Sequence, residues 1–182
     1  MNKTVLELTD KLINKRSLSA DEYEYLIENR NKEIFALIQN EAVRLRKKYY
    51  SNKVFIRGLI EISNICKNDC YYCGIRKSNK ECSRYRLTED EILCCCENGY
   101  KLGFRTFVLQ GGEDAYFTDE RLCKIISEIK SRYNDCAVTL SLGERSNESY
   151  QNLHNAGSDR YLLRHETADS EHYSSFIPNQ CH

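Results

Sequence analysis

The sequence has one proline in 182 residues and no excess of either charge, with 27 Lys plus Arg against 27 Asp plus Glu. A net charge of zero gives no general attraction to nucleic acid or to an anionic membrane. No apolar run approaches the ~20 residues that span a bilayer. Residues 1–15 carry charges throughout, unlike a signal peptide. We therefore expect a soluble, cytoplasmic protein that binds neither nucleic acid nor a membrane.

Cysteine is abundant, with ten in the chain. In the absence of an export signal, metal binding or catalysis is a better explanation than disulfides. Cys94–Cys96 fall within a predicted helix, where neighbouring side chains point about 100° apart and cannot easily share a metal. We interpret them as packing or surface residues. The same interpretation is given to Cys123, Cys136 and Cys181.

Residues 1–50 have the apolar spacing of helices. Ser19 and Glu22 form a capping-box pattern at the start of one of them. We expect an N-terminal helical segment, 1–50, that forms a layer over one end of the core. The remaining residues, 51–182, are expected to form a second domain.

From residue 54 the pattern alternates between strand and helix. The predicted strands are 54–63, 106–109, 137–142 and 161–163, and the predicted helices are 88–103, 122–133, 150–156 and a short one from 170. This alternation predicts an α/β fold with a parallel sheet, here a partial TIM-type (βα) barrel of about four βα units. A closed barrel of eight βα units needs roughly 250 residues. With only four units, the outer edge of the fourth strand would be exposed. We expect the N-terminal half of a barrel in preference to a chain that oligomerises through that edge.

Polar residues cluster at the carboxyl end of each predicted strand. The clusters are 66–73, 111–114, Glu144 and 164–167. In barrels and open α/β sheets the chemistry gathers at these ends. Four clusters in register therefore predict one shared site.

Cys66, Cys70 and Cys73 place three thiols within eight residues, enough to surround one metal centre. A four-iron cluster needs four ligands, so three cysteines leave one iron open to an exogenous ligand. Common ferredoxin spacings supply a fourth cysteine, and structural zinc usually takes four protein ligands. No Cys or His follows Cys73 at a typical zinc spacing, and Cys82 is a weak fourth candidate. Structural zinc and plain electron transfer remain as alternatives.

This C-x3-C-x2-C spacing, with Tyr72 before the third cysteine, resembles the signature of radical S-adenosylmethionine (SAM) enzymes. The resemblance implies a [4Fe-4S] cluster on Cys66, Cys70 and Cys73, which would be both metal ligands and catalytic residues. It implies that the open iron is chelated by SAM, and that an electron from the cluster cleaves the sulfonium bond to give a 5′-deoxyadenosyl radical. Tyr72 would lie near the adenine.

Gly111, Gly112 and Glu113 follow the second predicted strand. Glycines let backbone approach a ligand closely, and a carboxylate can accept an ammonium group. A tight strand-to-helix turn is the alternative. The pattern is similar to the GGE motif of radical SAM enzymes, which implies contact with the methionine amino group of SAM.

Side chains on the third and fourth strands are further candidates. Thr139 and Ser141 share a strand face, so their hydroxyls either project into the barrel or bond to nearby backbone. Arg164 suits an anionic substrate and Glu166 a ribose or an ammonium, unless the two form a structural ion pair. His165 points the other way and is interpreted as structural.

Several strings of residues together resemble the [FeFe]-hydrogenase maturase family HydE, which is similar to biotin synthase and methylornithine synthase. The strings are Ile62–Cys66, Cys73–Arg76, Arg84–Arg86, Phe107–Asp114, Thr139–Glu144 and Arg160–Ala168. The resemblance implies a (βα)8 barrel with an iron-containing small molecule as substrate, used in assembling the diiron subcluster. Glu166 would contact SAM, and Arg164, Thr139 and Ser141 would line the substrate cavity. The implied partners are an electron donor such as a ferredoxin or flavodoxin, and other hydrogenase maturases.

The chain departs from the family after the fourth strand. The family continues with an SFENR-like segment whose arginine meets the SAM carboxylate, whereas residues 174–182 read SSFIPNQCH. We expect a truncated chain that binds a cluster but is inactive alone. The rival hypotheses are a methylornithine-synthase- or biotin-synthase-like enzyme, and a non-catalytic iron–sulfur or zinc module.

Overall fold

The computed structural model describes residues 3–177 and divides the chain into two compact units, Met1–Phe55 and Ile56–His182. The N-terminal unit contains α1 (Lys3–Lys15), α2 (Ala20–Glu28) and α3 (Lys32–Tyr50). Its small core is formed by Val5, Leu18, Leu26 and Ile34. The predicted capping box is confirmed, since Ser19 and Glu22 exchange side chain-to-backbone hydrogen bonds at the start of α2.

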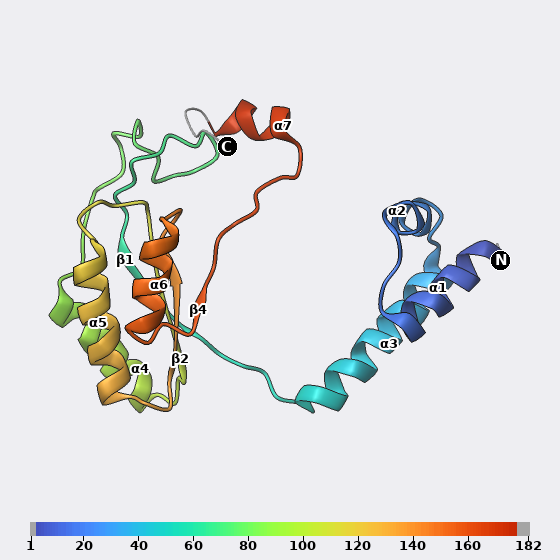
Figure 1. The fold of residues 1–182 in the computed structure, drawn as a ribbon, viewed down its shortest axis with the longest axis horizontal. Helices are drawn as coiled ribbons and strands as arrows, with labels where there is room; N and C mark the ends of the chain where they lie inside the picture. The colour runs from blue at the N-terminus through green and yellow to red at the C-terminus, as the bar shows by residue number, and fades with distance from the viewer. Residues whose placement is uncertain (1–2, 178–182) are drawn as a thin grey trace. The chain divides into compact units, whose positions relative to one another are not determined.

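The second unit is built on a parallel sheet with strand order β1-β2-β3-β4, the order of the strands in the chain (Figure 1). The strands are β1 (Gly58–Ser63), β2 (Thr106–Gly111), β3 (Ala137–Ser141) and β4 (Arg160–Tyr161). The helices are α4 (Glu89–Lys101), α5 (Asp119–Arg132), α6 (Asn147–Asn155) and α7 (Ser170–Phe176). Each strand is followed by a helix, so the predicted α/β fold of about four βα units is confirmed.

The sheet packs one face against helices. Alternate residues of β1, β2 and β3, such as Ile62, Leu109 and Leu140, are fully buried in one cluster with Ile92 of α4 and Ile126 of α5. This period of two is that of a strand with one apolar face. The carboxyl ends of the strands, where the predicted site residues lie, are thereby fixed in register.

Two strands are shorter than predicted. We expected the first from residue 54, but it begins at Gly58, whose partner is Phe107 near the start of β2. Val54, Phe55 and Ile56 have no neighbouring strand and are 78%, 68% and 68% exposed. Their β-branched and aromatic character predicted strand, but without a partner backbone no ladder forms.

The fourth strand is also shorter, because β4 comprises only two residues rather than the predicted 161–163. Leu162 still donates its N–H to the carbonyl of Leu140, at 2.8 Å. Beyond it the chain leaves β3, and Glu166 has a positive φ of 61°. No helix within residues 3–177 is long and apolar enough to span a membrane.

Candidate iron–sulfur and SAM site

A cavity of about 260 Å³ lies at the carboxyl ends of the four strands. All of the predicted site residues except Thr139 line it: Cys66, Cys70, Tyr72, Cys73, Gly111, Gly112, Glu113, Ser141, Arg164 and Glu166. They come from four segments separated in sequence, so the sheet brings together the clusters that the sequence placed after each strand.

Thr139 does not line the cavity. It is 6% exposed and pairs in register with Val108 of β2, two residues before Ser141 on the same strand face. Ser141, at the end of β3, reaches the cavity. The proposed role of Thr139 in substrate binding therefore has no support from its position, whereas that of Ser141 is compatible with its own. His165, interpreted as structural, is exposed and lies outside the cavity lining.

The segment carrying the three cysteines has no regular secondary structure and is held by side chains. Arg84 is the main tie, since its guanidinium donates to four backbone carbonyls, those of Asn64 (2.6 Å), Ile75 (2.8 Å), Arg76 (2.7 Å) and Asn79 (3.0 Å). Five N–H groups in a planar fork suit arginine to this role. Arg84 thus links the end of β1 to the residues that follow the third cysteine.

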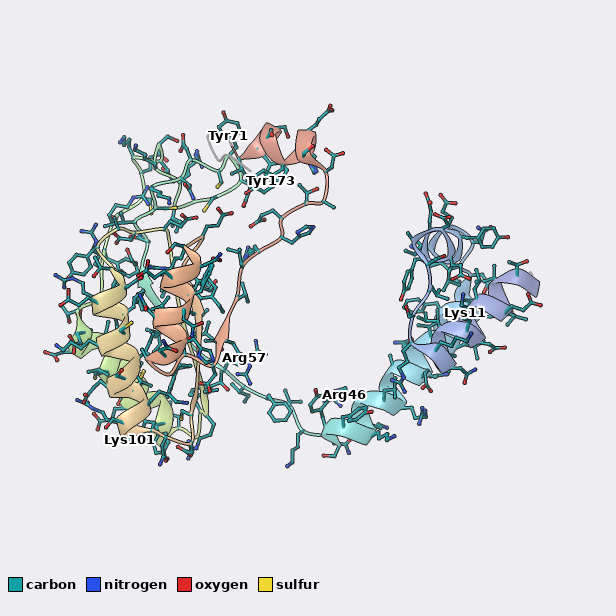
Figure 2. The ribbon with its side chains drawn as sticks, viewed as in Figure 1. Lys11, Arg46, Arg57, Tyr71, Lys101 and Tyr173 are labelled. Atoms are coloured by element: carbon teal, nitrogen blue, oxygen red, sulfur yellow. The ribbon has the colours of Figure 1, made fainter. Side chains whose placement is uncertain are left out.

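Helix α7 packs against the same segment. The N–H of Tyr71 donates to the carbonyl of Phe176 at 2.9 Å, and the rings of Tyr72 and Phe176 meet edge to face with centroids 5.5 Å apart. The labelled Tyr71 and Tyr173 mark this junction in Figure 2. Tyr173 and Ile177 are buried and line the cavity, although no motif in the sequence predicted a role for them.

Gly112 allows the cysteine segment to approach β2 closely. Its N–H donates to the carbonyl of Ser63 at 3.1 Å. A Cβ at this position would lie 2.3 Å from the carbonyl oxygen of Ile65 and 2.8 Å from Cβ of Cys66. Only glycine fits here, which explains its place in the motif by packing as well as by ligand access.

Glu113 is held by two residues of the cysteine segment that sequence reasoning missed. Its Oε1 accepts from Nδ2 of Asn68 at 2.8 Å, and its Oε2 pairs with Nζ of Lys67 at 2.9 Å. A Cβ on Gly143, which has a φ of 76°, would lie 2.0 Å from Cγ of Glu113. The carboxylate is therefore confined between the cysteine segment and the turn after β3.

At the ends of β1 and β2, Asp114 forms an ion pair with Arg86 and a hydrogen bond with Ser63. Asp114 is 2% exposed in its side chain and accepts from Arg86 Nε at 2.6 Å, from Arg86 Nη2 at 2.9 Å and from Ser63 Oγ at 2.7 Å. Burial raises the pKa of this carboxyl, but the bonds from Arg86 and Ser63 outweigh burial, so its pKa lies below the ordinary value.

The cavity also alters the acidity of its own groups. Burial, followed by the charges of Cys66 and Cys73, raises the pKa of the Cys70 thiol. Burial and then the nearby charge of Glu166 raise the pKa of the Tyr72 hydroxyl. Both groups are therefore protonated at neutral pH in the metal-free protein, and a metal bound by Cys70 would displace its proton.

The donor set fits a cluster bound by three thiolates. Cys66, Cys70 and Cys73 line one cavity, and all three are partly exposed to it rather than buried in the core. Within residues 3–177, no three Cys, His, Asp or Glu side chains converge to hold a single metal ion. Cys82 lies outside the cavity lining, and its sulfur accepts from Nδ2 of Asn64 at 3.5 Å. Among the cysteines that the structure describes, the others form no alternative metal-binding group: Cys94 and Cys95 are exposed on α4, and Cys96 is buried. Cys181 lies outside the described residues.

The sequence model of the radical SAM superfamily matches residues 60–180, which include every residue of this cavity. The chain belongs to the radical SAM superfamily. Members of this superfamily bind a [4Fe-4S] cluster and SAM, so the cofactors that the cysteine spacing implied are those of the family.

Relatives narrow the group within the superfamily. The [FeFe] hydrogenase maturase subunit HydE of Thermotoga maritima is 47% identical over 128 residues, covering 70% of this chain and 36% of the relative. A biotin synthase of Staphylococcus epidermidis is 32% identical over 162 residues, covering 86% and 50%. The crystal structure of methylornithine synthase superimposes with a TM-score of 0.81 at 28% identity, covering 96% of this chain and 52% of that one. This radical SAM chain thus spans about half, or less, of the length of the relatives it matches.

Proposed function

We propose that this chain carries the cluster-binding and SAM-binding half of a radical SAM enzyme of the HydE type. One observation supports it most. Three cysteines, the Glu113 carboxylate that follows two glycines, and residues at the ends of β3 and β4 surround one cavity. The 47% identity to HydE, against 32% to biotin synthase and 28% to methylornithine synthase, favours the maturase over the other two groups.

In this proposal the residues have separate tasks. Cys66, Cys70 and Cys73 hold three irons, and Glu113 accepts a hydrogen bond from the amino group of SAM. Glu166 and Tyr72 bind its ribose and adenine, and Ser141 and Arg164 line the substrate cavity. When bound, the cluster and SAM supply the electron transfer that cleaves the sulfonium bond and yields a 5′-deoxyadenosyl radical.

The substrate is proposed to be an iron-containing small molecule, and the partners an electron donor of the ferredoxin or flavodoxin type together with other hydrogenase maturases. The cationic Arg164 on the cavity wall suits a substrate with an anionic group. A methylornithine-synthase-like mutase is the second candidate, supported by the fold match over 96% of the chain. Product analysis with an amino acid as sole substrate would separate the two.

Residues 1–182 alone are proposed to bind the cluster without completing a maturation reaction, because they cover only 36% of the HydE relative. Turnover of SAM to 5′-deoxyadenosine by the isolated chain, at a rate equal to that of full-length HydE, would contradict this part of the proposal.

The cluster assignment is tested by iron and sulfide analysis after anaerobic reconstitution. The chain is expected to bind about four irons, and Ala substitution at Cys66, Cys70 or Cys73 is expected to remove most of them. Cys82→Ala and Cys95→Ala serve as matched controls, since neither sulfur lines the cavity. Iron content that fell equally in the control variants would argue against the three-cysteine site.

A further inference from the structure

The cysteine segment concentrates positive charge. Residues 67–86 hold six Lys or Arg and two Asp or Glu, whereas the whole chain has 27 of each kind. Two of the six cations are paired, because Lys67 lies 2.9 Å from Glu113 and Arg86 lies 2.6 Å from Asp114. The charged residues that remain in the segment have a net positive charge: Arg76, Lys77, Lys80 and Arg84 against Asp69 and Glu81.

Residues 76–80 form a turn that is bonded directly to the loop of the three thiols. The N–H of Lys77 donates at 2.9 Å to the carbonyl of Asn68, which lies between the first two cysteines. Arg76 donates to the carbonyl of Cys73 from its N–H at 3.2 Å and from Nη1 at 3.1 Å. The backbone of this turn therefore holds its side chains close to the cluster ligands.

The two lysines of this turn face solvent. Lys77 and Lys80 are exposed, and neither lines the cysteine cavity. Across the described residues 3–177, neither ammonium makes an ion pair or a side-chain hydrogen bond. The nearby Asp69 carboxylate accepts instead from the N–H of Ser78, at 2.9 Å. Both lysines are thus free to meet an anionic partner.

The cavity side of the loop is not available to a protein that delivers electrons. The cavity has a volume of about 260 Å³, which suits small molecules, and the proposed function places SAM and the substrate there. Reactive intermediates are protected when such a site is closed to water. A protein reductant must therefore approach the cysteines from outside the cavity, and residues 76–80 offer that approach.

We propose that the turn 76–80, through Lys77 and Lys80, is the docking surface for the electron donor, a small protein whose redox cofactor is surrounded by acidic side chains. This inference rests on the proposed function and names the place where its electron donor binds. One electron passes from the reduced cofactor of the donor to the oxidised cluster, and no covalent bond forms or breaks. The two lysines act on the encounter, because complementary charges steer association.

The test measures the rate at which an acidic flavodoxin, reduced to its hydroquinone, reduces the reconstituted cluster in a stopped-flow spectrometer. Lys77→Glu with Lys80→Glu is expected to lower the second-order rate about tenfold at low salt. The wild-type rate is expected to fall more steeply with ionic strength than that of the variant. Lys77→Arg with Lys80→Arg, which keeps both charges, is expected to retain the wild-type rate.

A matched control changes the net charge equally at a distant place. Lys101→Glu with Arg132→Glu reverses two exposed cations at the C-terminal ends of α4 and α5, and Figure 2 shows Lys101 at the opposite end of the second unit from Tyr71. Each cation forms a surface pair, with Glu97 or with Glu128, whose loss costs little stability. This variant is expected to keep the wild-type rate. Dithionite at high ionic strength is expected to reduce the cluster of every variant equally.

Carbodiimide cross-linking gives a readout that does not depend on electron transfer. The reagent joins a lysine amine to a carboxylate in contact with it, with loss of water. Cross-links from Lys77 or Lys80 to flavodoxin are expected, and mass spectrometry of the digested complex identifies them. The variant with both lysines replaced by arginine is expected to lose these cross-links while it keeps its rate.

Several results would overturn the docking surface. These are an unchanged flavodoxin rate in the double glutamate variant, an equal fall in the distant control, a parallel fall in the dithionite rate, or cross-links confined to other lysines. A wild-type cluster that dithionite reduces but flavodoxin does not would also overturn it. If the wild-type chain holds no cluster, or its reduced cluster is indifferent to SAM, the proposed function fails and the docking surface falls with it.

Discussion

At the scale of single residues, the position of Glu113 depends on partners distant in sequence. The motif after β2 predicted that this carboxylate contacts the amino group of SAM, but Lys67 and Asn68, which hold it, precede it by more than forty residues. Local spacing carries no information about which loops meet. Their meeting follows from the parallel pairing of β1 and β2, which brings both strand ends to one edge.

Gly143 offers a direct test of how Glu113 is confined. Gly143→Ala is expected to lose about 1–2 kcal/mol of unfolding free energy from its positive φ. It should lose about 1–3 kcal/mol more because the new Cβ overlaps Glu113. Gly103→Ala is the matched control, since Gly103 has a φ of 93° but no atom within 4 Å of an added Cβ. Urea unfolding measures the free energy of unfolding of both variants. Equal decreases in the two variants would show that Glu113 moves aside freely.

Asp114 predicts a pH dependence of stability. Its pKa is lower in the folded chain than the ordinary value of 3.8, because Arg86 and Ser63 hydrogen bond to the carboxylate. Its contribution to the unfolding free energy is thus present above that ordinary value and disappears as pH falls through the lower folded value. Asp114→Asn is expected to lose about 1.5–3 kcal/mol at neutral pH, and less at acid pH. A constant difference between the two proteins from pH 7 to pH 2 would contradict this.

At the scale of elements, helices were easier to predict than strand lengths. The caps at Ser19 and Thr88 are local signals: the capping box predicted at Ser19 forms, and a second one forms between Thr88 and Glu91. The start of β1 and the end of β4 depend on whether a partner strand is alongside, which the residues themselves do not specify. The apolar residues Val54, Phe55 and Ile56 therefore have the character of a strand although no partner strand lies beside them.

The cysteine segment is expected to depend on Arg84. Arg84→Lys leaves one ammonium in place of a fork that reaches four carbonyls, so it should lower the unfolding free energy by about 2 kcal/mol and speed the loss of iron to a chelator. Arg105→Lys is the control, because Arg105 donates to two carbonyls away from the cavity. Absorbance during chelation gives the rate. Equal rates of iron loss from the two variants would show that Arg84 does not hold the cysteine segment in place.

Helix α7 is expected to protect the same segment. Phe176→Ala removes the ring that meets Tyr72, which should raise hydrogen exchange at the Tyr71 amide about two- to tenfold. Ser174→Ala, on the exposed side of α7, should leave it unchanged. Exchange measured by mass spectrometry on peptides covering residue 71 decides the matter. Unchanged protection in Phe176→Ala would mean that α7 does not hold the segment.

At the scale of the whole molecule, four polar clusters identified separately in the sequence border one cavity. Their convergence was predictable, because parallel strands place their carboxyl ends at one edge. The sequence did not predict which positions along a strand reach the cavity. Thr139 and Ser141 share a face of β3, but only Ser141 lines the cavity. The partners of each side chain likewise became visible only in three dimensions.

The central claim is that three thiolates hold a cluster with one iron free for SAM. EPR spectroscopy of the anaerobically reconstituted and reduced chain, with and without SAM, tests it most directly. We expect the signal of a reduced [4Fe-4S] cluster whose g values change when SAM is added, while Cys73→Ala gives no such signal. A signal indifferent to SAM, or protein that holds a single zinc ion in place of iron, would contradict the claim.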